Sequence, residues 1–170
     1  MRKLLIIALT VMLSGLSAAY AIHQTIPSET FVALPGPYAE AVYNYITVED
    51  PYKKWKLWPG KGRLYKGAHP HGALLTTYIN DNAESSIRLG REMLNGSMIV
   101  KENYMETKKL EAITVMYKIQ KYSPGTGDWY WIKYDKNWKV EKQGKVEECI
   151  NCHSEKKSND YVFTGEFAKE

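Results

Sequence analysis

The spacing of apolar residues changes along the chain, and each spacing predicts a different element. Residues 38–47 carry apolar side chains at helical intervals, and Asp50-Pro51 then disfavours continuation, so a helix is predicted there. Residues 71–79 are dense in Leu, Thr and Tyr, which favours a strand. The following Asn-Asp pair at 80–81 can cap a short helix that runs toward Gly90.

Three later runs predict strands, at residues 97–105, 112–120 and 129–134. The last two are joined by the turn-forming sequence Ser-Pro-Gly-Thr-Gly-Asp at 123–128, and so short a connection favours an antiparallel hairpin. A further turn is expected near residues 142–144. Together these elements predict an α+β, β-rich fold, an antiparallel sheet with a few short helices.

The first residues have the pattern of a secretory signal peptide. An Arg-Lys pair at 2–3 is followed by an apolar stretch at 4–16 and a small-x-small cleavage site, Ala-Tyr-Ala, at 19–21. The apolar stretch is shorter than the roughly 20 residues that span a bilayer, although 18–22 could extend it. Cleavage is therefore favoured over an uncleaved anchor, and the mature chain is expected in the periplasm.

Removal of residues 1–21 leaves 22–170, a length suited to a single domain with its own core. The loss of Arg2 and Lys3 lowers the formal net charge from +4 to +2. This near-neutral balance argues against a general nucleic-acid binder. The thirteen tyrosines and five tryptophans fit an aromatic, sheet-rich interior.

The most specific motif lies near the end of the chain and uses its only two cysteines, Cys149 and Cys152, followed at once by His153. In this Cys-x-x-Cys-His pattern each thiol can add to a haem vinyl group, and the histidine can coordinate the iron from the proximal side. Bacterial c-type haem is attached after export, so the leader and the motif support each other. One covalently attached haem c is the expected cofactor.

The same cysteines would also suit a redox dithiol, a structural disulfide or half of a zinc site. A redox site of the thioredoxin type should open a helix after a βαβ pattern. A closed zinc site needs four ligands and would recruit from distant histidines, which are His23, His69 and His71.

One run of basic residues contains no acid and is interleaved with Trp and Tyr; its members are Lys53, Lys54, Lys56, Lys61, Arg63 and Lys66. Such a run can steer an acidic redox partner protein or hold haem propionates. A solvated face docked to the body by its tryptophans is the simpler interpretation.

The chain resembles the cytochrome P-460 family, with its relative cytochrome c prime beta, over roughly Lys61 to Phe167. The matching stretches occur in the same order: Gly67 to Gly72 (GAHPHG), Gly96 to Asn103 (GSMIVKEN), Trp129 to Trp131 (WYW), and Cys149 to His153 followed by Asn159 to Thr164 (NDYVFT). The resemblance implies a predominantly β-sheet mono-haem protein, a homodimer, that acts on or binds small nitrogen species. Hydroxylamine oxidation and nitric oxide binding are the activities it implies.

In that family a lysine on a Gly-x-x-x-Val-Lys-Glu-like strand can bond covalently to the haem rim, which makes the iron able to oxidise hydroxylamine. Lys101 matches that pattern, and relatives without the cross-link bind small gases instead. Since successive strand residues face opposite sides, only one charge of the Lys101-Glu102 pair is expected to point inward. A neutral, buried amine suits such bonding, whereas a surface lysine paired across the strand is the alternative.

The roles of His69 and His71 stay open at this point. Either imidazole can ligate the distal iron, bind a second metal, or simply be hydrogen-bonded in a turn beside Pro70 and Gly72. Only seventeen residues follow His153, so any distal ligand must come from upstream. A six-coordinate electron-transfer cytochrome without catalysis is therefore the alternative to a hydroxylamine-oxidising enzyme.

Overall fold

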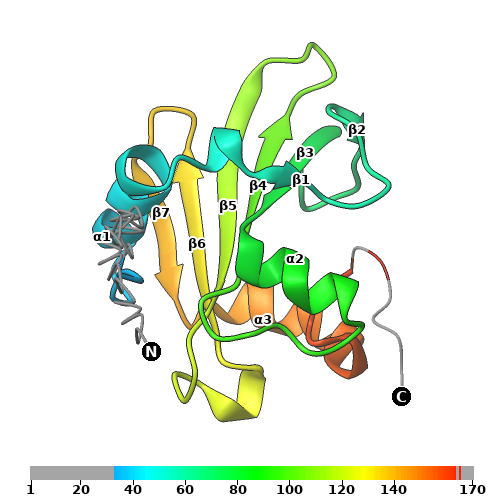
Figure 1. Cartoon of the computed structure of the whole chain (residues 1–170). Coiled ribbons are helices and arrows are strands. Elements are labelled where there is room, and N and C mark those ends of the chain that lie inside the picture. The colour runs from blue at the N-terminus through cyan, green and yellow to red at the C-terminus, as the bar shows by residue number, and fades with distance from the viewer. Residues whose placement is uncertain (1–32, 164, 166–170) are drawn as a thin grey trace, which may run out of the picture. The chain divides into compact units, whose positions relative to one another are not determined.

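The computed structural model describes residues 33–163 and 165, and the predicted signal peptide at 1–21 lies outside them. Within the described residues seven strands form one antiparallel sheet, in the order β1-β3-β4-β5-β6-β7, with β2 also paired to β3 (Figure 1). The strands are β1 (Lys56–Leu57), β2 (Tyr65–Lys66), β3 (Leu74–Ile79), β4 (Met98–Tyr104), β5 (Leu110–Lys118), β6 (Trp129–Asp135) and β7 (Val140–Gly144). The predicted α+β, β-rich class is confirmed.

The helices are short. They are α1 (Ala39–Asn44), which continues into a π-helical turn (Tyr45–Glu49), α2 (Asp81–Arg88) and α3 (Glu147–His153), with 3-10 turns at Tyr52–Lys54, Pro124–Thr126 and Ser154–Asn159. Among the residues described, no helix is long and apolar enough to cross a membrane.

Asn80 caps α2 as predicted, because its side-chain oxygen accepts a hydrogen bond from the Ala83 N–H at 3.1 Å. The same oxygen accepts from the Met98 N–H at 2.9 Å, and the Asn80 amide donates to the Gly96 carbonyl at 2.8 Å. One side chain therefore starts the helix and fixes it to the beginning of β4.

The predicted antiparallel hairpin is formed by β5 and β6, but the turn expected near residues 142–144 is wrong. Those residues lie in β7, and the chain turns earlier, where Asp135 Oδ1 accepts hydrogen bonds from the Asn137 and Lys139 N–H groups. β7 is an edge strand with mostly exposed polar side chains, so it lacks the apolar alternation that reveals a strand.

The sheet is covered on both faces. One face carries a cluster that includes Tyr78, Val100 and Tyr134 and packs against α1. The opposite face carries a second cluster with Ile99, Met116 and Trp131, over which α2, α3 and the segment after α3 lie (Figure 1). A residue on either side of β4 therefore points toward other parts of the protein.

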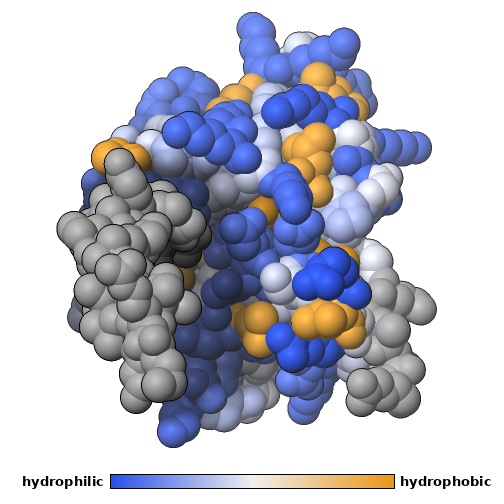
Figure 2. Space-filling view, viewed as in Figure 1, coloured by the Kyte–Doolittle hydropathy of each residue, from blue (hydrophilic) through white to orange (hydrophobic). Residues whose placement is uncertain are grey.

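The face seen in Figure 2 is mostly hydrophilic, with hydrophobic residues in small separate groups. Among the residues that the structure describes, the exposed large hydrophobic side chains are Leu34, Tyr38, Tyr43, Val48, Leu89, Met105 and Phe163. Scattered residues of this kind are normal on a protein surface. The homodimer stays a prediction.

Candidate functional site

Helix α3 places the three residues of the cysteine-histidine motif on one side. Cys149, Cys152 and His153 stand at positions i, i+3 and i+4 of the helix, which share a face, and all three line one cavity. The two cysteines are free thiols rather than a disulfide, and burial raises the pKa of the Cys149 thiol. Within residues 33–163 and 165, no three His, Cys, Asp or Glu side chains form a metal-binding group, and the candidate zinc ligand His23 lies outside these residues.

His153 is almost fully buried and is held in one orientation. Its Nδ1–H donates to the carbonyl oxygen of Tyr161 at 2.6 Å, which leaves the lone pair of Nε2 for a metal. The rings of Trp131 and Phe163 pack against it edge-on, with centroids 4.7 and 5.1 Å from its own. Burial lowers the pKa of His153, so the imidazole is in the neutral form that ligates metals.

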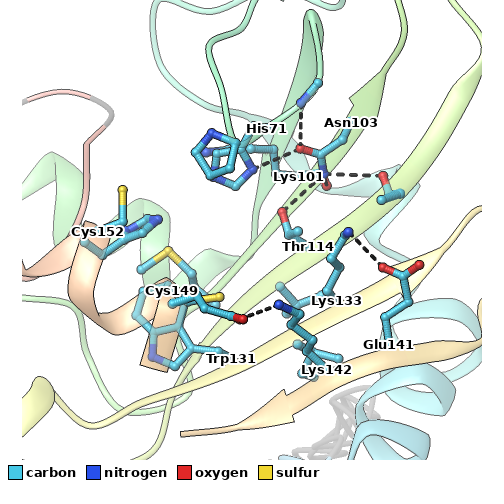
Figure 3. A pocket seen from close by; sticks show the side chains of 18 of the residues that line it. His71, Lys101, Asn103, Thr114, Trp131, Lys133, Glu141, Lys142, Cys149 and Cys152 are labelled. Carbon is cyan, nitrogen blue, oxygen red and sulfur yellow. Dashed lines mark hydrogen bonds and ion pairs between the residues drawn. The ribbon is translucent and has the colours of Figure 1, made fainter. Parts of the chain in front are cut away.

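The cavity has a volume of about 360 Å³, and a second cavity of about 460 Å³ adjoins it. Both are lined by Pro70, His71, Lys101, Cys152 and His153, which makes them two lobes of one slot. In Figure 3 the two cysteines lie across the first lobe from His71 and Asn103. A planar group that filled both lobes would contact the five residues that the lobes share.

Lys101 projects into this slot from β4. Its neighbours across the sheet are Thr77 and Thr114, and its amine takes part in none of the ion pairs found among the described residues. Burial lowers the pKa of Lys101 to about 8. The alternative of a surface lysine paired with a charge across the strand is therefore not what the fold forms.

The expectation that only one charge of the Lys101-Glu102 pair points inward is wrong, because the sheet is covered on both faces. Glu102 is 1% exposed on the opposite face, where it accepts hydrogen bonds from the hydroxyl groups of Tyr52 and Tyr104 and from the amine of Lys53. It therefore cannot serve as a proton acceptor in the slot.

His71 lines both lobes of the slot, whereas His69 is exposed and borders only the second lobe. The Nδ1 atom of His71 lies 3.0 Å from Oδ1 of Asn103. Burial, followed by the nearby charge of Lys101, lowers the pKa of His71 to about 4, so its ring is neutral near pH 7. Asn103 had no signal of its own in the sequence, because its role depends on a contact 32 residues away.

The basic run is divided between several surroundings. Lys53 pairs with Glu102 and Lys56 with Glu84, while Lys61 and Lys66 line the second lobe of the slot. These two ammonium groups are suitably charged for the carboxylates of a bound group.

The donor set fits a covalent haem. Two thiols on one helix face can form the thioethers, a buried imidazole offers its Nε2, aromatic rings of Trp131 and Phe163 line the slot, and lysines stand at one side of it. A family model described as Cytochrome P460 matches residues 49–164. A comparison with curated proteins finds no match.

Proposed function

The chain belongs to the cytochrome P-460 family of haem cytochromes, and on that basis we propose that it is an exported c-type mono-haem cytochrome that binds or oxidises small nitrogen compounds. The proposed compounds are nitric oxide, which would be bound, and hydroxylamine, which would be oxidised. The observation that carries the proposal is that Lys101, Cys149, Cys152 and His153 line one cavity. Haem, when bound there, would supply an iron that exchanges electrons and binds small ligands.

Attachment is assigned to Cys149 and Cys152. Their spacing on α3 directs both thiols into the same cavity, and each would add across one vinyl group. His153 follows on the same face, and the Tyr161 carbonyl holds its Nδ1 proton, so Nε2 is the atom that would bind the iron. These residues fix where the haem would stand before any reaction takes place.

Lys101 is assigned the cross-link to the haem rim. Because burial lowers the pKa of Lys101 to about 8, more of its amine is neutral near pH 7 than in an ordinary lysine, and the neutral amine can attack a carbon. Joining Nζ to a haem carbon replaces one N–H and one C–H bond by an N–C bond and releases two protons and two electrons. A peroxide-class oxidant would take up those electrons.

The periplasmic location rests on the leader pattern and on the need to attach c-type haem after export. Fractionation of cells that produce the full chain tests it. The mature protein should appear in the periplasmic fraction with an N-terminus near Ile22, and intact protein in the cytoplasm would contradict this part of the proposal.

The proposed function is tested on the purified, haem-loaded full chain. Intact mass spectrometry should show one haem retained after denaturation, and Cys149→Ala and Cys152→Ala should each lose one attachment bond. Asn151→Ala, an exposed position between them, is the control and should keep the haem.

Activity is measured in parallel as electron transfer from hydroxylamine to an acceptor and as nitric oxide binding to the reduced protein. We expect at least one of the two. A protein that retains haem but neither binds nitric oxide nor oxidises hydroxylamine would contradict the assignment to nitrogen compounds and leave electron transfer as its function.

A further inference from the structure

Two imidazoles lie close together where the lobes of the slot meet. The ring centroids of His71 and His153 are 6.3 Å apart, and the two ring planes are inclined by 86°. Both rings line both lobes, so a planar group that extended from one lobe into the other would contact both imidazoles. Two imidazoles on opposite sides of one metal ion, with metal–nitrogen bonds of about 2 Å, have centroids roughly 6 Å apart.

The hydrogen bonds of Asn103 settle which nitrogen of His71 carries the proton. The Asn103 amide nitrogen donates to the carbonyl oxygens of Lys101 and Ala112, at 3.0 and 3.3 Å, and its Oδ1 accepts from the Gly72 N–H at 3.3 Å. Since Oδ1 is an acceptor, the Nδ1 of His71 must donate to it. The lone pair of His71 is therefore on Nε2.

His153 has the same arrangement, because its Nδ1–H donates to the carbonyl of Tyr161. Each ring is thus fixed by a hydrogen bond at Nδ1 and presents Nε2 as its free donor atom. A metal-ligating histidine usually donates a hydrogen bond from its other ring nitrogen to a backbone or side-chain oxygen, which fixes the orientation of the ring.

The loop that carries His71 is closely packed against β4. A Cβ atom on Gly72 would lie 2.5 Å from the backbone nitrogen of Tyr104, and one on Gly67 would lie 2.0 Å from the Gly72 carbonyl oxygen. The loop is closed by a hydrogen bond from the His71 N–H to the Ala68 carbonyl at 3.0 Å. His71 is therefore held by backbone packing as well as by Asn103.

We propose that Nε2 of His71 is the sixth, distal ligand of the haem iron, opposite His153. The inference rests on the proposed function only in requiring haem in the slot. It makes the resting iron six-coordinate and low-spin, and a small ligand such as nitric oxide or carbon monoxide then binds only after His71 has left. The distal imidazole thus limits access of small molecules to the iron. The protein can still exchange electrons without binding or converting a substrate.

The test uses the haem-loaded full chain and reads spin state and carbon monoxide binding. The wild-type protein should have low-spin optical and electron paramagnetic resonance spectra, and its carbon monoxide association rate should level off at high gas concentration. His71→Ala should become high-spin and bind carbon monoxide at least about tenfold faster, because the competing state is removed. Added imidazole should restore the low-spin spectrum.

His69→Ala is the matched control, since it removes an exposed imidazole two residues earlier in the same loop, and it should keep the wild-type spectra. A high-spin wild-type iron, or low-spin spectra that persist in His71→Ala, would overturn the proposal. If Lys101→Met rather than His71→Ala produced the high-spin form, the distal ligand would be Lys101 and the proposal would again fail.

These outcomes are separate from those of the proposed function. Nitrogen chemistry is read by turnover, so it can fail while the change of spin state in His71→Ala stands, and that change requires only that haem occupies the slot. Equally, a five-coordinate wild-type protein that oxidised hydroxylamine would support the proposed function and refute the distal ligand.

Discussion

The Nδ1–H of His153 donates to the carbonyl oxygen of Tyr161, eight residues further along the chain, at 2.6 Å. This contact depends on Asp160, which holds the segment in place. The Asp160 carboxylate accepts a hydrogen bond from the Met93 N–H at 2.9 Å and forms an ion pair with Lys118 at 2.6 Å. The backbone carbonyl oxygen of Asp160 accepts a hydrogen bond from the Trp129 indole N–H at 2.9 Å. The buried Asp160-Lys118 ion pair therefore supports the segment whose carbonyl orients the His153 imidazole.

Substitution of Asp160 by Asn should destabilise the fold and disturb His153. Asp160 has a left-handed backbone (φ 50°), which Asn tolerates, so the change removes the charge and one of the two acceptor oxygens without straining the backbone. Lys118 would remain buried without its partner, at a cost of about 3 kcal/mol in the free energy of unfolding. Urea unfolding measures this cost.

Glu84→Gln is the control for that experiment, because it breaks the ion pair with Lys56 near the surface. Its effect should be below about 1 kcal/mol. Equal losses in the free energy of unfolding from Asp160→Asn and Glu84→Gln would mean that the buried ion pair stabilises the fold no more than the surface pair does.

Stability at acid pH should depend on Glu102. Burial alone would raise the pKa of Glu102, but hydrogen bonds from Lys53, Tyr104 and Tyr52 outweigh it and hold the pKa below the usual 4.5. Because the folded-state pKa is the lower one, the stabilisation is present above about pH 4.5 and is lost as the pH falls through the folded-state pKa. Glu102→Gln should cost about 2 kcal/mol at neutral pH.

The difference in the free energy of unfolding between the wild-type protein and Glu102→Gln should shrink as the pH falls. Urea unfolding between about pH 3 and pH 7 measures this difference. Glu106→Gln, at an exposed turn position, is the matched control and should leave the free energy of unfolding within about 0.5 kcal/mol. A difference for Glu102→Gln that stayed constant with pH would rule out titration of this carboxyl group as the cause.

Local patterns were enough to predict four of the strands and the first two helices, whereas β1, β2 and α3 were not predicted. The Asn80 cap, the runs that became β4, β5 and β6, and the hairpin between the last two all depend on residues close together in the sequence. β7 escaped prediction because an exposed edge strand needs few apolar residues. The inward position of both Lys101 and Glu102 also escaped, since burial on each face depends on helices distant in the sequence.

The site was predictable where its residues are adjacent and unpredictable where they are not. The Cys-x-x-Cys-His pattern of Cys149, Cys152 and His153 already indicates haem, because these residues are adjacent in the sequence. The roles of the Tyr161 carbonyl and the Asn103 amide cannot be inferred from the sequence, since each acts through a contact made by folding. For the same reason the sequence could not choose between the possible roles of His71.

Replacement of Lys101 should separate a cross-linked haem from an ordinary one. In the wild-type protein we expect a haem peptide whose mass includes the Lys101 segment and a red-shifted ferrous Soret band. Lys101→Arg keeps a positive charge in the slot but should lose both signatures, because its guanidinium stays protonated and is a poor nucleophile. A haem peptide confined to Cys149 and Cys152 in the wild-type protein would exclude the cross-link.

Asn103 should act on the iron through His71. Asn103→Leu removes the oxygen that accepts from His71 Nδ1, and loss of such a support typically weakens metal ligation by about 10- to 100-fold. The high-spin fraction and the carbon monoxide association rate should both rise. Asn103→Asp loses the same amide donors but keeps the acceptor, so it should stay mainly low-spin; identical spectra for the two variants would show that the acceptor is not what matters.

Gly72 should be intolerant of any side chain, because its loop lies directly on β4. A Cβ atom there would lie 2.5 and 2.6 Å from the backbone nitrogen and oxygen of Tyr104, and a backbone cannot move aside as a flexible side chain can. Gly72→Ala should therefore either lower the free energy of unfolding by more than about 2 kcal/mol or lift the loop and its His71 away from the slot. Urea unfolding detects the first outcome, and a higher high-spin fraction detects the second.

Gly62→Ala, where a Cβ atom meets nothing within 4 Å, is the control and should change the free energy of unfolding by less than about 0.5 kcal/mol. A Gly72→Ala protein with wild-type stability and wild-type spectra would mean that the contact between the loop and β4 does not hold His71.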